Sequence, residues 1–182
     1  MSTSELDTPY HHGDLNRALR AAAARILVED GIGAVTLREV ARMAGVSHNA
    51  PYRHFPSREA LLAALAVDGF ISLRRRLEAV SGPQRVTALG KAYLAFAAEE
   101  RPHFLLMFCG AIDKAAFPDP SAAAANAFAV LEAAIAAEPG GTPAAALRAW
   151  ALVHGLAHLV AERQILPETA FAALDEAGGA VD

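Results

Sequence analysis

The chain has 182 residues, of which 54 % are hydrophobic and 20 % are charged, and its formal net charge at pH 7 is −4. This length accommodates a small module and a second helical domain, and it excludes two large enzyme domains. Much of the hydrophobic content is alanine, which favours helices over strands, so we predict an all-α fold.

Cysteine usage and the N-terminal sequence predict a cytoplasmic location. The single cysteine, Cys109, has no partner for an internal disulfide bond, which fits a reducing cytosol. Residues 1–9 have neither the basic start nor the apolar core of a signal peptide. Polar residues interrupt the later apolar runs before they reach the ~20 residues needed to span a bilayer, so we expect a soluble protein.

Charge is distributed unevenly along the chain. Residues 1–80 contain ten Arg and nine acidic residues, whereas residues 81–182 contain six basic and eleven acidic residues. An acidic chain is not typical of nucleic-acid binders. A basic surface confined to one part of the chain can nevertheless bind phosphates, with an affinity that depends strongly on salt.

The first predicted element is a scaffold helix that follows a flexible arm, residues 1–12. Asp14 is a candidate N-cap for this helix. Apolar residues at helical spacing continue to Asp30-Gly31, where glycine ends the helix. We expect the helices that follow to pack against it.

Residues 36–47 predict a second helix and a tight turn. Thr36 and Glu39 have the spacing of a capping box, in which the Thr36 hydroxyl accepts the Glu39 amide and the Glu39 carboxylate reaches back to the Thr36 amide. Apolar residues recur at helical spacing as far as Ala44. Gly45 follows where the helix must stop, and glycine adopts the left-handed conformation of such a turn at little cost.

A third helix is predicted over His48–Phe55, with Ser47 as its N-cap. Its face is largely polar, and only Ala50 and Phe55 resemble core anchors. Pro51 lacks an amide hydrogen and is tolerated only near a helix start. A short helix with so little apolar surface offers its remaining face to a partner, so we predict that it enters the major groove of DNA. The predicted DNA-binding residues are Thr36, Arg38, Ser47, His48, Asn49, Ala50, Tyr52, Arg53, His54 and Arg58.

From Tyr10 to Leu65 the chain resembles the TetR/AcrR family of bacterial transcriptional regulators. The resemblance rests on five blocks in order: Asp30-Gly31, Thr36-Leu37-Arg38-Glu39-Val40-Ala41, Ala44-Gly45-Val46-Ser47, Tyr52-Arg53-His54-Phe55 and Ser57-Arg58-Glu59-Ala60-Leu61. Where most members have Lys after the serine, this chain has Arg58, which replaces a point charge with a planar fork. The resemblance implies a homodimeric transcription repressor that binds a palindromic operator through a helix-turn-helix and is released by a small-molecule effector.

The connection to the rest of the chain is a longer helix. Pro56-Ser57 separates it from the predicted DNA-contacting helix, and it runs from Arg58 to about Ala79. Ser81-Gly82-Pro83 then breaks the chain. The expected organisation is an arm (1–12), a helix-turn-helix domain (13–57), a connecting helix (58–80) and an effector-binding and dimerisation domain (81–182).

Proline and glycine divide the last domain into further predicted helices. These are Pro83–Glu100, Pro102–Cys109, Ser121–Glu138, Pro143–Ile165 and Glu168–Ala177. The family resemblance implies that the last two pack with their copies in a partner chain as a four-helix bundle.

Aromatic and large apolar residues are concentrated in these helices. An ordinary helical core accounts for most of them, but a cavity bounded by such residues would suit a small apolar or aromatic effector, as the resemblance implies. The segment Trp150-Ala151-Leu152-Val153-His154-Gly155 also resembles the Trp, His and Gly signature of one TetR effector-domain subgroup. The predicted effector-binding residues are Tyr93, Phe96, Phe104, Met107, Phe108, Phe128, Trp150 and His154.

A competing hypothesis uses His154, His158 and Glu162, which lie at i, i+4 and i+8 along one helix stripe. Two His at that spacing can share a metal, so the chain could be a metal sensor or an enzyme. We favour core or interface histidines, because a zinc site needs three or four ligands at defined distances. Nothing beside Cys109 suggests an activated thiolate. We therefore predict no metal, no cofactor and no catalytic residue.

Overall fold

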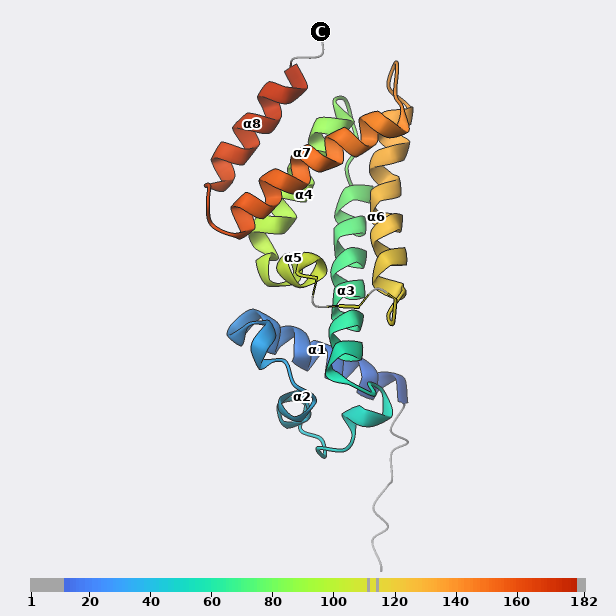
Figure 1. Cartoon of the computed structure of the whole chain (residues 1–182), viewed down its shortest axis with the longest axis vertical. Coiled ribbons are helices and arrows are strands. Elements are labelled where there is room, and N and C mark those ends of the chain that lie inside the picture. Colours follow the sequence, from blue (N-terminus) through green and yellow to red (C-terminus); the bar gives the residue numbers. More distant parts are fainter. Residues whose placement is uncertain (1–11, 111, 114, 180–182) are drawn as a thin grey trace, which may run out of the picture. The chain divides into compact units, whose positions relative to one another are not determined.

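The computed structural model describes residues 12–110, 112–113 and 115–179, and the predicted N-terminal arm lies outside them except for its last residue (Figure 1). Within these ranges there are helices and no strands, so the all-α prediction is confirmed. The α-helices are α1 (His12–Asp30), α2 (Leu37–Met43), α3 (Arg58–Glu78), α4 (Arg85–Glu99), α5 (Arg101–Phe108), α6 (Asp119–Ala136), α7 (Pro143–Ala161) and α8 (Pro167–Gly179). Two short 3-10 helices are η1 (Ile32–Ala34) and η2 (Pro51–Arg53).

The chain divides into two compact units, residues 1–61 and residues 62–182. In the N-terminal unit, α1 contacts η1 and α2. Its small core is apolar and fully buried, with Leu19, Ile26, Val35 and Val40 among its members. The unit therefore has a fixed interior on which the surface of α2 and the following turn is held.

The two ends of α2 form as the sequence predicts, with one difference. The Thr36 hydroxyl accepts a hydrogen bond from the Glu39 amide (3.2 Å), which confirms the N-cap. The Glu39 carboxylate accepts from the Arg42 guanidinium instead of reaching back to Thr36, so the reciprocal half of the capping box was wrong. At the other end Gly45 has φ 68°, and the amide of Val46 donates to the Ala41 carbonyl (3.0 Å). This is a Schellman turn, which requires a left-handed residue.

The predicted α-helix over residues 48–55 was wrong in form. The two residues after Ser47 lie in a turn, and only the single 3-10 turn η2 follows. The Ala50 amide donates to the Ser47 carbonyl and the His54 amide to the Pro51 carbonyl, each at 2.9 Å, and both bonds join residues three apart. Pro51 has no amide hydrogen for the Ser47 carbonyl four residues earlier, so an α-helical ladder from His48 is interrupted at this bond. The Phe55 amide donates to the Pro51 carbonyl (2.9 Å) across four residues only after this interruption. Ser47 consequently takes part through its carbonyl and not as the expected side-chain cap.

The first predicted helix also begins earlier than expected. It starts at His12, so Asp14 lies in the first turn of α1 and not before it. The Asp14 carboxylate pairs with Arg17 at 3.1 Å. Every predicted helix from Arg58 onward is present, and its ends differ from the prediction by at most four residues.

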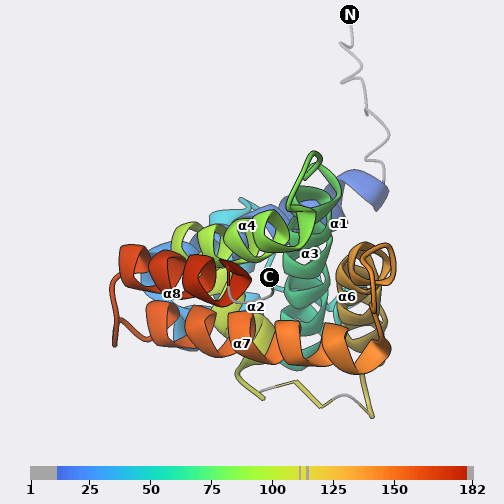
Figure 2. The same ribbon diagram turned by 90° about the horizontal axis from the view of Figure 1, so that it is seen from above.

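In the C-terminal unit, α4 packs against both α7 and α8, and these three helices lie side by side in Figures 1 and 2. Phe96 and Phe104 are fully buried in its core. Gly90 lets α8 approach α4, because a Cβ at this position would lie 2.8 Å from a methyl carbon of Leu174. An ion pair between Lys91 and Asp175 (2.7 Å) joins the same two helices.

One helix in the described part of the chain, α7, is long and apolar enough by length and composition to cross a membrane, and 28 % of its apolar window is buried. A single such helix is weak support for a membrane span, because core and interface helices of soluble proteins pass the same test. Its exposed side chains include Leu147, Leu152 and Leu159, at 55 %, 42 % and 37 % exposure. The apolar character of α7 is thus largely on its surface.

Candidate nucleic-acid interface and aromatic cluster

Most of the predicted DNA-binding side chains lie on the surface of the N-terminal unit. Tyr52 is 56 % exposed, although large aromatic residues are usually well buried. We call the exposed members of the set the polar surface; they are Thr36, Arg38, Ser47, His48, Asn49, Tyr52 and Arg53. The other predicted residues, Ala50, His54 and Arg58, are half-buried. The turn and η2 thus present polar groups to solvent, as predicted, despite the absence of the expected α-helix.

Two apolar side chains anchor this segment. Pro51 and Phe55 are both buried, and Phe55 is only 5 % exposed. The His54 ring lies 6.5 Å from the Phe55 ring, centroid to centroid, which holds it partly against the core. Since η2 has one turn, these anchors and not a helical ladder fix the direction of Tyr52 and Arg53.

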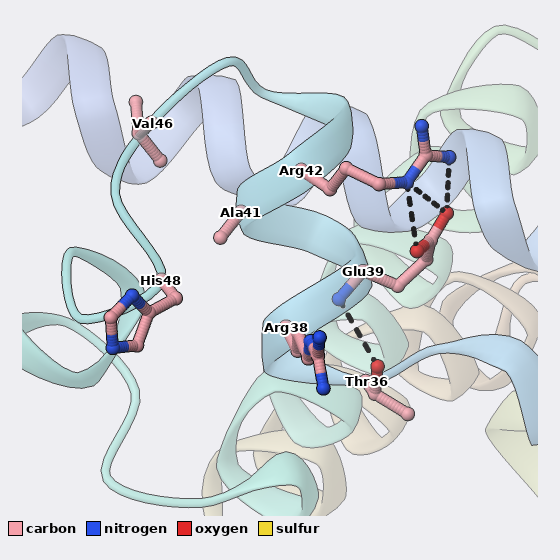
Figure 3. A pocket seen from close by; sticks show the side chains of 7 residues that line it. All are labelled: Thr36, Arg38, Glu39, Ala41, Arg42, Val46 and His48. Carbon is pink, nitrogen blue, oxygen red and sulfur yellow. Dashed lines mark hydrogen bonds and ion pairs between the residues drawn. The ribbon is translucent and has the colours of Figure 1, made fainter.

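A hollow of about 350 Å³ lies between α2 and the segment that carries Val46 and His48 (Figure 3). Its lining combines cations with a hydroxyl group and one carboxylate; the residues are Thr36, Arg38, Glu39, Ala41, Arg42, Val46 and His48. A concave surface with several N–H donors suits an anionic group such as a phosphate.

The cations around this hollow differ in their partners. Arg42 is paired with Glu39 at 2.5 Å, and this hydrogen bond lowers the pKa of the Glu39 carboxyl. Arg38 and Arg53 have no carboxylate partner within the described ranges. Their charges are therefore available to an external anion, whereas an anion that approaches Arg42 must compete with the Glu39 carboxylate.

Arg58 makes contacts that the sequence did not indicate. Its Nε donates to the Val35 carbonyl (2.7 Å) and its Nη2 to the Ile32 carbonyl (2.5 Å). Beside it, the Ser57 hydroxyl accepts from the Ala60 amide (3.2 Å) and caps α3. A serine just before a helical run is a recognisable N-cap signal, so the role of Ser57 could be predicted from the sequence. The partners of Arg58 lie more than 20 residues away, so its contacts could not be predicted.

In the C-terminal unit, six of the eight predicted effector-binding residues meet in one group of ring contacts. We call this group, together with His158, the aromatic cluster; its members are Tyr93, Phe104, Phe108, Phe128, Trp150, His154 and His158. The shortest ring separation is 4.5 Å, between Phe108 and His154. Trp150 stacks on His154 with an interplanar angle of 25° and a separation of 5.0 Å. His154 is the centre of the cluster.

A hydrogen bond of 2.8 Å joins the Tyr93 hydroxyl to His154 Nδ1. Burial raises the pKa of the Tyr93 phenol, and a hydrogen bond from Trp150 opposes this rise. Burial, and then the nearby His158, lower the pKa of His154 to about 4. His154 is thus neutral at pH 7, and its Nδ1 either accepts the Tyr93 hydroxyl proton or donates to the Tyr93 oxygen, according to its tautomer.

Two predicted effector-binding residues lie away from the aromatic cluster. Phe96 is fully buried with the Arg76 guanidinium 5.7 Å from its ring centre. Met107 is directed at α3, because a Cβ on Gly69 would lie 2.6 Å from its Sδ. Phe96 instead lines a separate groove of about 200 Å³ with Asp68, Gly69, Ser72, Glu100 and His103.

The histidine stripe on α7 is packed among aromatic rings. The His154 and His158 rings are 4.6 Å apart, and His158 also lies 5.1 Å from the Phe104 ring. Glu162 is exposed where α7 ends. Within the described part of the chain no group of three or more His, Cys, Asp or Glu side chains could hold a metal ion.

Comparison with known proteins agrees with this architecture. Residues 19–65 match the model of bacterial regulatory proteins of the tetR family, and residues 86–177 match the tetracyclin repressor-like C-terminal domain. Over 91 residues the chain is 36 % identical to an uncharacterised HTH-type transcriptional regulator of Mycobacterium bovis, a match that covers 50 % of this chain and 47 % of that protein. The chain thus spans about half the length of the curated relatives it matches.

Solved structures extend the likeness to nearly the whole chain. A protein of unknown function from Rhodococcus sp. RHA1 is 34 % identical, with a TM-score of 0.81 and coverage of 96 % of this chain and 98 % of that one. The multidrug binding protein EbrR, complexed with imidazole, has a TM-score of 0.67 at 21 % identity, covers 97 % and 96 % of the two chains, and shares the fold. Because the two family models together span both units, the chain belongs to the tetR family of bacterial regulatory proteins.

Proposed function

We propose that this protein is a homodimeric transcription repressor whose polar surface binds a palindromic operator. The observation that supports this most directly is the exposure of Asn49, Tyr52 and Arg53 on a segment held by only two buried anchors. Exposed aromatic and amide side chains on such a segment gain nothing within the subunit, so they are available for an external partner.

The side chains divide by the part of DNA that they suit. Arg38 and Arg53 supply free charge for phosphates, which position the protein without selecting sequence. Asn49 presents a donor and an acceptor that can pair with an adenine edge in the major groove. The Tyr52 hydroxyl reaches either a base or a backbone oxygen. His48 belongs to the hollow beside α2 and would contact the phosphate that this hollow accepts.

Dimerisation is proposed to use α7 and α8. Leu147, Leu152 and Leu159 lie within one broad face of α7, and Leu166, just before α8, is 69 % exposed. An exposed helix face that carries three leucines is a candidate interaction surface. A two-fold axis through this surface places the same face of both copies together and provides two DNA-binding units for a palindrome. The two half-sites would then be about 34–36 Å apart, one turn of DNA.

The effector is proposed to be a small apolar or aromatic molecule that binds at the aromatic cluster. Rings already pack here at separations of 4.5–6.2 Å, so a flat ligand could replace one of these contacts with its own. His154 adds a hydrogen-bonding group in its neutral form. EbrR, which shares the fold, is described as a multidrug binding protein, and this supports effector binding by the same type of domain.

Release from DNA follows from binding linkage and needs no catalytic step. The effector must bind the DNA-free geometry more tightly than the DNA-bound geometry, since otherwise it changes no operator affinity. The connecting helix α3 begins in the N-terminal unit and continues in the C-terminal unit, so it joins the two units covalently. The protein would act in the cytoplasm, where the operator is.

Selection of bound DNA from a random pool tests this proposal. Recovery of a palindrome by the purified full-length protein would support sequence-specific binding, two-fold symmetry and the half-site spacing together. Recovery of unrelated sequences, or of none above background, would contradict the proposal.

A further inference from the structure

The strongest unexplained interaction in the N-terminal unit is that of Arg58, the first residue of α3. Its guanidinium is half-buried and donates to two backbone carbonyls, those of Val35 (2.7 Å) and Ile32 (2.5 Å). The two donors, Nε and Nη2, form the edge of the guanidinium that normally binds both oxygens of a carboxylate or phosphate. This edge is therefore already occupied within the protein.

The two carbonyls lie at the start of the segment that carries the polar surface. Ile32 opens η1 and Val35 is the last residue before Thr36, the N-cap of α2. Arg58 follows this segment directly, so its hydrogen bonds join the two ends of residues 36–57. Between these ends are only the seven-residue α2, a turn and η2. A segment with so little regular structure depends on its end contacts for a fixed conformation.

Helix stability does not explain a cation at this position. The first turn of a helix carries a partial positive charge, which disfavours Arg and favours an anion such as the neighbouring Glu59. The Ser57 hydroxyl already caps α3 through the Ala60 amide. The position of Arg58 is thus explained by its reach to the Ile32 and Val35 carbonyls.

We infer that Arg58 is a positioning residue for operator binding, which holds the two ends of the polar-surface segment together and does not itself contact a DNA phosphate. This inference rests on the proposed DNA-binding function. Its consequence is that Arg58 acts on affinity through the geometry of Asn49, Tyr52 and Arg53. Loss of one charged hydrogen-bond pair should lower operator affinity by about tenfold or more.

The salt dependence of binding separates this role from a phosphate contact. Affinity for the palindrome recovered by the wild-type protein would be measured between about 50 and 200 mM salt. Arg58→Gln should bind more weakly at every salt concentration, but the slope of log affinity against log salt concentration should equal that of wild type. Arg58→Lys keeps the charge but not the fork, and should also bind more weakly than wild type. The matched control Arg53→Gln removes a free cation and should reduce the slope by about one for each half-site.

A measurement on the free protein tests the same inference without DNA. Hydrogen exchange at the Val40 amide, which donates to the Thr36 carbonyl, should be faster in Arg58→Gln and in Arg58→Lys than in wild type, while exchange in α7 is unchanged. Unchanged exchange at α2 in both variants would overturn the inference. So would a slope for Arg58→Gln that falls as far as that of Arg53→Gln, or wild-type affinity in Arg58→Lys. If the wild-type protein recovers no palindrome, the proposed function fails, and exchange at α2 still decides whether Arg58 fixes this segment.

Discussion

The two units present their candidate functional side chains in opposite ways. In the N-terminal unit, polar groups such as Asn49 and Arg53 stand exposed above a small apolar core. In the C-terminal unit, the candidate residues contact one another, and His154 is surrounded by the rings of Tyr93, Phe108 and Trp150. Internal packing accounts for the second arrangement, but it does not account for the first.

This difference shows how much support the structure gives to the DNA-binding proposal and to the effector-binding proposal. The exposure of Tyr52, a large aromatic side chain, favours an external partner, and the cations Arg38 and Arg53 on the same surface favour an anionic one. A closely packed aromatic cluster has the same appearance whether it is a core or a ligand site at rest. Both proposals draw on the family relationship, and the exposed polar surface adds support to the DNA-binding proposal that the packed aromatic cluster does not add to the effector proposal.

The largest expected effect concerns the apolar face of α7. Leu152→Asp places a charge in the proposed dimer interface and should weaken dimerisation by about a hundredfold or more. Sedimentation at micromolar concentration would then show monomers, with operator binding lost as a result. Val28→Asp is the matched control, since Val28 is an apolar residue of α1 with 56 % exposure, and it should remain dimeric. A wild-type protein that is itself monomeric would refute the symmetric mechanism.

The next effect concerns Arg53, which has no carboxylate partner in the described structure. Arg53→Ala should lower operator affinity by about tenfold to a hundredfold, with little change in unfolding temperature, because it removes an exposed cation. Binding titrations measure this directly. Arg17→Ala serves as the control, because Arg17 is exposed and paired with Asp14, and its affinity should match wild type. Equal losses in both variants would indicate a general charge effect and not a defined contact.

The features of the candidate sites that could be predicted from the sequence are those set by neighbouring residues. The Thr36 cap and the Gly45 turn follow from local spacing, and the exposure of Asn49 and Tyr52 follows from the scarcity of apolar residues around them. The α-helix over residues 48–55 was wrong because Pro51, three residues after the predicted start, cannot donate to the Ser47 carbonyl, although its missing amide hydrogen was evident in the sequence.

Other features were outside the reach of sequence patterns because they join distant residues. The bonds of Arg58 to the segment before α2, and that of Tyr93 to His154, span 23 to 61 residues and depend on how the helices pack. Met107 lies against Gly69 and Phe96 lies beneath the Arg76 guanidinium, apart from the other six predicted effector-binding residues, and their contact with an effector stays a prediction. Residue type thus predicts which residues are buried, but it does not predict which buried residues contact one another.

A smaller effect is the pH dependence contributed by the aromatic cluster. The folded pKa of His154, about 4, lies below the ordinary value of 6.5, so the unfolded chain binds more protons between these values. The contribution to stability is complete above pH 6.5, falls as pH decreases towards 4 and is lost below it. Because the His154 ring is half-buried and partly screened by solvent, the expected loss in the free energy of unfolding is up to about 2 kcal/mol. Urea unfolding at several pH values measures this loss. His154→Gln should flatten this dependence; an unchanged profile in His154→Gln would contradict the assignment.

The smallest expected effect concerns the paired cation beside the hollow. Glu39→Gln removes a carboxylate from the hollow's lining and frees Arg42, so operator affinity should rise by about twofold to fivefold at low salt. The gain should vanish at high salt. Glu29→Gln, which frees Arg25 on α1, should leave affinity unchanged. Weaker binding by Glu39→Gln would mean that the ion pair itself holds the DNA-binding geometry.

Photocrosslinking to DNA determines whether the polar surface contacts the operator. Tyr52 and Val28 are both 56 % exposed in the N-terminal unit, so a photoreactive amino acid can replace either one with equal access to solvent. We expect the probe at Tyr52 to crosslink to the bound operator and the probe at Val28 not to do so. Crosslinking from Val28 but not from Tyr52 would show that DNA binds a different face of the protein.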